Sequence, residues 1–264
     1  MLPYLHLFGR DIPLYGLSAI LGLVLALCYL KATQPKHTPL NADTELTLIW
    51  GCIGALVGAK LLYLATVLPD FLHDLPLLRQ APRDFLARYL LGGFVFYGGL
   101  FGALLAAFLY CRTSRISFSA VLTQLLPVIP LIHAFGRIGC FCSGCCYGRP
   151  SQRFGIAFSH ALAAPNGIKL LPVQLYEAAT TLGLFVLLAV LRRRGTPGRR
   201  MLAVYFLLYG VIRFVLEFFR GDRYRGFVGV LSISQILSLV VVVLALVLLF
   251  PRRRAVRQYL PFAD

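Results

Sequence analysis

The chain has 264 residues, of which 59% are hydrophobic and 14% are charged, and its mean hydropathy is +0.78. Soluble domains carry about 25% charged residues, so this composition excludes an ordinary soluble protein and predicts an integral membrane protein. The formal net charge is +16. Because most Lys and Arg residues flank apolar runs, we expect this charge to face anionic lipid and exclude nucleic acid as the partner.

Seven apolar runs are long enough to cross about 30 Å of hydrocarbon as helices. They cover about residues 14–30, 46–68, 89–110, 119–138, 174–191, 201–219 and 231–250. The runs predict an all-α integral membrane protein with about seven transmembrane helices. We expect a single transmembrane domain over residues 1–264, with outer loops at about 69–88 and 139–173.

The distribution of basic residues predicts the orientation. Two tight clusters, Arg192–Arg194 with Arg199 and Arg200, and Arg252–Arg254 with Arg257, fall on the same side of the membrane in a seven-span topology. By the positive-inside rule that side is cytoplasmic, so the N-terminus lies outside and the C-terminus is cytoplasmic.

The sixth run carries charges inside an apolar segment. Arg213, Glu217 and Arg220 stand at i, i+4 and i+7 and share one helix face with Tyr209. Charged residues are expensive in a membrane and are functional candidates by default. This face is either a structural salt bridge or, because two arginines oppose one glutamate, a site for an anion.

His133 and Arg137 form a second candidate pair at the outer end of the fourth run. They are also four residues apart and therefore lie on one helix face. A histidine on an apolar helix is either a structural hydrogen-bond donor or a titrating group in catalysis. Both readings stay open.

The third run contains two glycine pairs around one tyrosine, in the order Gly92-Gly93, Tyr97, Gly98-Gly99. Paired glycines in a membrane helix permit close helix packing. Glycine also lets the backbone open towards a cavity or a phosphate. The two roles are compatible with each other.

Four cysteines, Cys140, Cys142, Cys145 and Cys146, crowd the segment that follows Arg137. Their spacing differs from the paired C-x-x-C pattern of structural zinc sites. Disulfides are compatible with the oxidising side of the membrane, and a covalent role in group transfer stays open. We favour small, weakly polar packing residues in a loop and predict no metal.

Several polar residues are predicted at one depth in the outer half of the membrane. Tyr15, Tyr97, Arg137 and the face from Arg213 to Arg220 would together form a cationic pocket rich in hydroxyl groups. Such a pocket suits the headgroup of an anionic phospholipid.

These segments resemble those of the bacterial prolipoprotein diacylglyceryl transferase family. Any single segment is weakly specific, but they follow the family's order over nearly the whole chain. The matching pieces are Tyr15-Gly16, Gly93–Gly102, Gly136–Arg149, Pro172–Glu177, Tyr209–Arg220 and Ser234–Ser238.

The resemblance implies a multi-pass enzyme of the bacterial inner membrane with no cofactor. Such an enzyme transfers the diacylglyceryl group from phosphatidylglycerol to the lipobox cysteine of a prolipoprotein signal peptide, forming a thioether and releasing glycerol phosphate. By position, Arg137 and Arg213 would bind the phosphate. The supporting substrate-binding residues would be Tyr15, Gly98, Gly99, Gly148, Tyr209, Glu217 and Arg220.

Three positions depart from the family pattern. Tyr97 stands where the family usually has His, Cys140 where it has Asn, and Cys145 where it has Glu. Either Tyr97 or His133 could therefore be the general base. If nearby arginines lower the pKa of the acceptor thiol enough to ionise it, the reaction needs no general base. The alternatives are a divergent paralogue, a non-catalytic protein that binds anionic lipid, and a transporter, although no repeated half is present. The sequence specifies neither the oligomeric state nor the acyl-chain preference.

Overall fold

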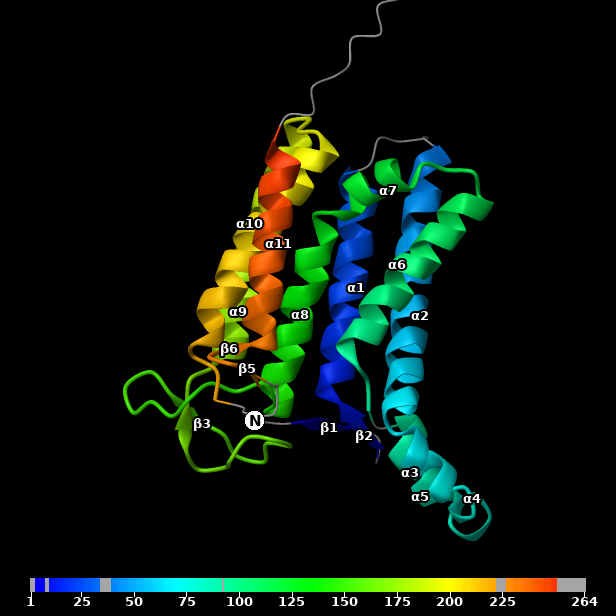
Figure 1. Ribbon diagram of the computed structural model, residues 1–264, viewed down its shortest axis with the longest axis vertical. Coiled ribbons are helices and arrows are strands. Elements are labelled where there is room, and N and C mark those ends of the chain that lie inside the picture. The colour runs from blue at the N-terminus through cyan, green and yellow to red at the C-terminus, as the bar shows by residue number, and fades with distance from the viewer. Residues whose placement is uncertain (1–2, 8–9, 34–38, 92, 222–226, 251–264) are drawn as a thin grey trace, which may run out of the picture. The chain divides into compact units, whose positions relative to one another are not determined.

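The computed structural model describes residues 3–7, 10–33, 39–91, 93–221 and 227–250 (Figure 1). The chain divides into two compact units. Unit 1 comprises residues 1–22 and 129–264, and unit 2 comprises residues 23–128. Gly92 and the basic cluster from Arg252 to Arg257 lie outside the described residues.

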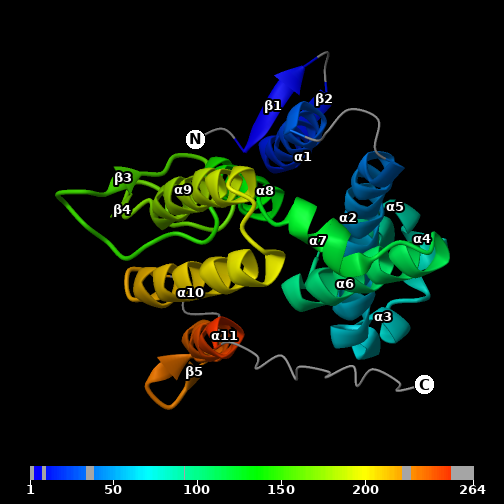
Figure 2. The same cartoon turned by 90° about the horizontal axis from the view of Figure 1, so that it is seen from above.

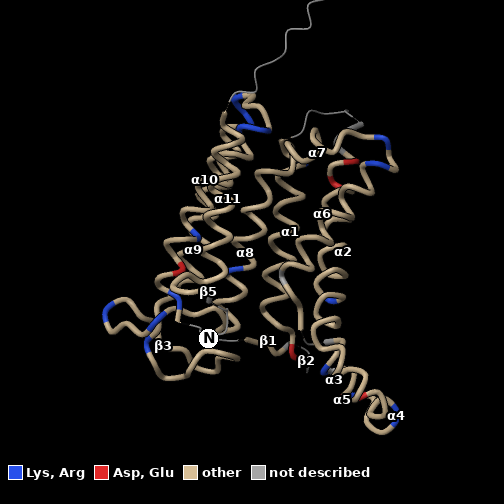
Figure 3. Tube along the Cα trace, viewed as in Figure 1, with Lys and Arg blue, Asp and Glu red and all other residues tan. Residues whose placement is uncertain are grey.

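Helices account for most of the described chain, and each predicted apolar run overlaps at least one described helix. The helices are α1 (Leu14–Thr33), α2 (Pro39–Thr66), α6 (Phe96–Thr113), α7 (Phe118–Leu125), α8 (Val128–Ser143), α9 (Val173–Arg193), α10 (Gly198–Glu217) and α11 (Ile233–Leu249). Three of the described helices, α1, α2 and α9, are long and apolar enough to cross a membrane, and α7 with α8 would make a fourth if the pair forms one broken span. Charged positions gather mostly at helix ends and in loops, with few inside the helices (Figure 3).

The predicted run at 119–138 is divided between α7 and α8. Pro127 lies at the break between them. Proline has no backbone N–H and its ring clashes with the preceding turn, so a continuous helix is disfavoured there. Ser117 caps α7 by accepting a hydrogen bond from the Ala120 N–H at 3.4 Å.

In unit 2, α2 and α6 pack closely through glycines. A Cβ atom added to Gly98 would overlap the carbonyl oxygen of Gly58, and one added to Gly102 would overlap that of Gly54. Small residues thus let the two backbones approach, as in other membrane helix pairs. The predicted loop at 69–88 is built from α3 (Leu68–His73), α4 (Leu77–Gln80), α5 (Pro82–Leu86) and the π-helical turn η1 (Ala87–Leu91).

The backbone opens just before α6, where Gly93 adopts a φ of 69°. Lys60, on α2, donates hydrogen bonds from Nζ to the carbonyl oxygens of Tyr89 at 3.2 Å and Gly93 at 3.0 Å. The ammonium group therefore satisfies carbonyl groups that the interrupted helix leaves free. Helix packing, one of the two roles considered for the glycine-rich segment, occurs at Gly98. At Gly93 an added Cβ would overlap the Tyr63 ring, so this turn packs against α2.

In unit 1, α10 packs against both α9 and α11 and lies between them (Figure 2). α10 and α11 approach closely at Gly210, where an added Cβ would lie 3.1 Å from the carbonyl oxygen of Ser238. α11 begins with a capping box formed by Ser232 and Gln235. This packing places one face of α10 next to the first turns of α9 and of α11.

Three small antiparallel hairpins accompany the helices: β1 (Tyr4–Leu7) with β2 (Arg10–Pro13), β3 (Ile156–Ala157) with β4 (Lys169–Leu170), and β5 (Phe227–Val228) with β6 (Leu231–Ser232). The sequence predicts only helices, because strands of two to four residues are too short to show a clear alternation.

The loop after α8 is tied to the end of α10. Gly148 pairs with Arg220 as an isolated bridge, and its N–H donates to the Leu171 carbonyl oxygen at 2.9 Å. The N–H of Arg149 donates to the Phe219 carbonyl oxygen at 2.9 Å. These bonds hold the cysteine-rich segment beside α9 and α10.

Candidate functional site

Glu177 on α9 is the centre of a buried polar cluster in unit 1. Its side chain is 1% exposed. Oε1 lies 3.1 Å from Arg137 Nη2 on α8 and 3.4 Å from His133 Nε2, and Oε2 lies 3.9 Å from Arg213 Nη1 on α10. The Tyr209 hydroxyl donates a hydrogen bond to Oε1 at 3.3 Å. One carboxylate on α9 therefore joins polar groups from two other helices.

Arg213 is held by a second carboxylate and by α11. Its Nη2 lies 2.8 Å from Glu217 Oε2 and donates to Ser234 Oγ at 3.1 Å. Among the described residues, its buried Nη1 atom has no hydrogen-bond acceptor. A buried donor without an acceptor is costly, so a ligand that brings an oxygen to this nitrogen would be stabilised.

His133 contacts both Arg137 and Tyr209. Its Nε2 atom accepts a hydrogen bond from Arg137 Nε at 3.2 Å, and its ring meets that of Tyr209 edge-to-face at 5.3 Å. His133 is therefore placed to orient Arg137.

The charges of the cluster differ from the sequence prediction. Glu177 supplies a negative partner that the count along α10 did not include. Arg137 and Arg213 contact Glu177, and Arg213 also contacts Glu217, so two positive charges meet two negative ones.

Three of the four clustered cysteines lie close together. The sulfur atoms of Cys140, Cys145 and Cys146 are all within 4.8 Å of one another, whereas Cys142 is not part of the group. Arg137 and Arg220 interact electrostatically with Cys146. The thiols thus adjoin the arginines of the Glu177 cluster.

The other predicted residues of unit 1 occupy supporting positions. The Tyr15 phenol interacts electrostatically with Cys140, Cys145 and Arg137. At Gly148 an added Cβ would lie 2.6 Å from the Leu171 carbonyl oxygen, so this glycine permits close packing of the loop. Arg220 lies where α10 has ended, joined to Gly148 by the bridge.

Tyr97, Gly98 and Gly99 belong to unit 2, on α6. Tyr97 is 38% exposed. Gly98 packs against α2, and a Cβ on Gly99 would lie 3.3 Å from the Ala55 carbonyl oxygen. The described contacts of these glycines are therefore helix–helix contacts.

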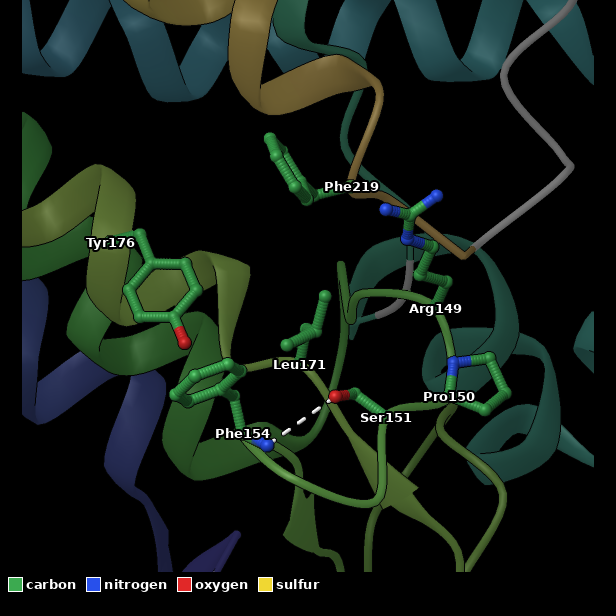
Figure 4. Close-up of a pocket in the computed structure, with 7 residues that line it drawn as sticks. All are labelled: Arg149, Pro150, Ser151, Phe154, Leu171, Tyr176 and Phe219. Carbon is green, nitrogen blue, oxygen red and sulfur yellow. Dashed lines mark hydrogen bonds between the residues drawn. The ribbon is translucent and has the colours of Figure 1, made fainter.

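A cavity of about 390 Å³ lies in unit 1 (Figure 4). Arg149, Pro150, Ser151, Phe154, Leu171, Tyr176 and Phe219 line it. The Arg149 guanidinium lies 5.3 Å from the centre of the Phe219 ring, and the Phe154 N–H donates to Ser151 Oγ at 3.3 Å. Arg149, which ends the predicted segment Gly136–Arg149, thus lines a partly apolar cavity next to the bridge formed by Gly148.

Glu177 and Lys60 were not among the predicted site residues. Both are ionisable residues in apolar helices, and that property alone marks them as candidates. Glu177 lies in the predicted segment Pro172–Glu177, but nothing in its local spacing shows that it meets arginines from two other helices. Its partners are 40 and 36 residues away in the chain, at Arg137 and Arg213.

Apolar helices around a buried cluster of arginine, glutamate, histidine and tyrosine define an integral membrane protein with a polar site between its helices. The chain matches the family model for prolipoprotein diacylglyceryl transferase over residues 3–251. It therefore belongs to the prolipoprotein diacylglyceryl transferase family.

Curated relatives agree with this assignment. The chain is 34% identical over 243 residues to a phosphatidylglycerol–prolipoprotein diacylglyceryl transferase of Clostridium tetani, covering 91% of this chain and 93% of the relative. It is 34% identical over 255 residues to the protein of that name from Methylococcus capsulatus, covering 91% and 92%. A second clostridial relative, transferase 2 of Clostridium perfringens, is 32% identical and covers 90% of each chain.

Proposed function

We propose that this chain transfers the diacylglyceryl group of phosphatidylglycerol to the lipobox cysteine of prolipoproteins, the step that attaches lipid during lipoprotein maturation. The acceptor thiol would form a thioether, and glycerol phosphate would be released. Family membership and the relatives' names support the enzyme class and the two substrates.

The observation that carries the proposal is the convergence of Arg137 and Arg213 on the buried Glu177. A guanidinium group holds two phosphate oxygens at once and stays ionised, so two fixed arginines suit a phosphodiester. The unsatisfied Nη1 of Arg213 offers one donor for this purpose. Glu177 and Glu217 keep both arginines oriented when no lipid is bound.

The arginines would act on the leaving group. A thiolate attacks a glyceryl carbon, the carbon–oxygen bond breaks, and its electron pair passes to the phosphate oxygen. Negative charge on the phosphate then rises from one to two. Preorganised donors in a water-poor site stabilise such growing charge more than the starting diester.

The acceptor thiol must lose its proton, because the thiolate is the nucleophile. Tyr97 and His133 stay as proposed bases. The contact with Arg137 favours an orienting role for His133, because its Nε2 atom is already an acceptor. Tyr15, Tyr209, Glu217, Arg220 and Gly148 would support the lipid site, with Gly98 and Gly99 acting through the packing of α6.

We further propose that the protein spans the bacterial inner membrane seven times, with the N-terminus outside. The predicted basic clusters support this orientation. In this topology the Glu177 cluster would lie in the outer half of the membrane, facing the incoming prolipoprotein.

A dual-label transfer assay tests the proposal. Membranes containing the full chain are incubated with a lipobox peptide and phosphatidylglycerol labelled separately in the acyl chains and in the headgroup glycerol. We expect the acyl label on the peptide and the headgroup label in free glycerol phosphate. A peptide with Ser in place of the lipobox Cys should take up no label. Absence of labelled peptide, with the Clostridium tetani relative active alongside, would contradict the proposal.

A further inference from the structure

The cluster of Cys140, Cys145 and Cys146 has the dimensions of a metal site. Its three sulfur atoms lie within 4.8 Å of one another. Three thiolates at about 2.3 Å from one tetrahedral zinc ion would be roughly 3.8 Å apart. The three cysteine side chains would therefore need to move only slightly to coordinate one ion.

The backbone brings these sulfurs together by an unusual turn. Gly144 has a φ of 69° and Cys146 has a φ of 59°, a left-handed conformation that residues with a side chain adopt rarely. The Cys145 N–H donates to the Cys140 carbonyl oxygen at 3.1 Å. The chain thus turns back at the end of α8, so that Cys145 and Cys146 return to Cys140.

A buried side chain holds the turn in place. Gln174, 1% exposed on α9, donates from Nε2 to the Cys145 carbonyl oxygen at 2.7 Å. Residues that hydrogen-bond to the metal-binding segment without touching the ion fix the position of the metal ligands. Cys145 and Cys146 are partly exposed, so a metal ion or a substrate can reach the cluster from the protein surface.

The surrounding charges suit a thiolate-bound cation. Arg137 and Arg220 interact electrostatically with Cys146, and Arg137 also with Cys140. Zinc with three thiolates carries one negative charge, and a fourth thiolate adds another. Buried charges persist only when they are paired, and these two arginines provide the pairing.

We propose that Cys140, Cys145 and Cys146 bind a Zn²⁺ ion whose fourth position accepts the thiol of the incoming prolipoprotein cysteine. This inference rests on the proposed function and assigns the group that ionises the acceptor. Catalytic zinc sites combine three protein ligands with one open position. A thiol that binds such an ion is deprotonated outright.

The step balances without a further reactant. The acceptor S–H proton passes to water as sulfur binds zinc. The thiolate attacks the glyceryl carbon, a carbon–sulfur bond forms, and the carbon–oxygen bond to phosphate breaks. Glycerol phosphate departs with the electron pair. The thioether has no charge and is a weaker ligand, so it leaves the ion.

Metal content tests the site without turnover. The full chain is purified in detergent, loaded with Zn²⁺ or Co²⁺, and freed of excess metal. We expect one metal per chain and sulfur-to-cobalt charge-transfer absorption in the native protein and in Cys142→Ser, whose thiol lies outside the cluster. Cys145→Ser and Cys146→Ala should lose both signals. Absence of stoichiometric metal from the native chain, equal binding by Cys145→Ser, or a disulfide among the three cysteines would overturn the proposal.

The cobalt form also tests the fourth position. A lipobox peptide should strengthen the charge-transfer band, whereas the peptide with Ser in place of Cys should not. An unchanged spectrum with both peptides would contradict acceptor binding at the metal.

The pH dependence separates this inference from the proposed function. A free thiol with a pKa near 8.5 is about 3% ionised at pH 7, so metal-free protein should transfer about 30-fold more slowly there. The deficit should shrink as the pH rises to about 8.5, and Zn²⁺ should restore the rate at pH 7. Full transfer by metal-free protein would overturn the zinc site and leave the proposed function intact. Metal binding without any transfer by the native chain would overturn the proposed function and the acceptor role of the fourth position, and would leave the three-cysteine zinc site standing.

Discussion

Glu177 determines the geometry of the candidate site because a single buried carboxylate contacts Arg137 and His133 on α8 and faces Arg213 on α10. Each arginine would otherwise be a buried cation in an apolar bundle. The carboxylate lowers that cost and also fixes the spacing of the two guanidinium groups. Stability and the proposed function would therefore depend on the same residue.

Replacing Glu177 by Gln should destabilise the protein and remove its activity. The side chain keeps its volume, but both arginines lose a charged partner, which costs about 3–5 kcal/mol for a buried pair. Unfolding in mixed micelles would measure the change, and labelled transfer would measure the activity.

Glu45→Gln is a matched control, because Glu45 lies 3.9 Å from the exposed Lys31. Its effect should be below about 1 kcal/mol. Equal stability losses in the two variants would contradict the central role of Glu177.

At the scale of the helices, the effect of a glycine on stability depends on what its α-carbon faces. Gly98 on α6 faces the backbone of α2, whereas an added Cβ at Gly183 on α9 meets no atom within 4 Å. The same residue type in two apolar helices therefore predicts opposite responses to substitution.

Gly98→Ala should destabilise the protein by about 1–3 kcal/mol, because the new methyl group forces α2 and α6 apart. Gly183→Ala should be neutral or stabilise by about 0.5–1 kcal/mol, because alanine restricts the unfolded chain more than glycine does. Thermal unfolding of both variants in one detergent tests this pair. Equal melting temperatures would contradict the packing role of Gly98.

Helix positions could be predicted from apolar runs, since burial in lipid demands long uninterrupted hydrophobic segments. The division at Pro127 was not predicted, although proline disfavours a continuous helix. The partners of Glu177 and the grouping of Cys140 with Cys145 and Cys146 could not be read from local spacing. They depend on how α8, α9 and α10 pack and on the left-handed turn at Gly144 and Cys146.

At the scale of the whole molecule, the chain belongs to the prolipoprotein diacylglyceryl transferase family, and its proposed topology places two loops on opposite sides of the membrane. Gly167 lies in the loop after α8, and Gly195 lies between α9 and α10. Both have positive φ and open space around an added Cβ. Each position should accept a short insertion without disturbing the helices.

Epitope tags inserted after Gly167 and after Gly195 should therefore react differently in intact spheroplasts. The tag at Gly167 should bind antibody directly, and the tag at Gly195 only after the membrane is permeabilised. Antibody binding to both tags in intact spheroplasts would contradict the proposed orientation.

The central claim is that Arg137 and Arg213, oriented by Glu177, hold the phosphate of phosphatidylglycerol while the thioether forms. The most direct measurement is the rate of labelled diacylglyceryl transfer to a lipobox peptide by the Arg213→Lys protein. Lysine keeps the charge but lacks the planar fork, so the rate should fall by about 10²-fold or more. The exposed Arg79 on α4 provides a matched control, and Arg79→Lys should transfer at the native rate. A native rate in Arg213→Lys would contradict the account.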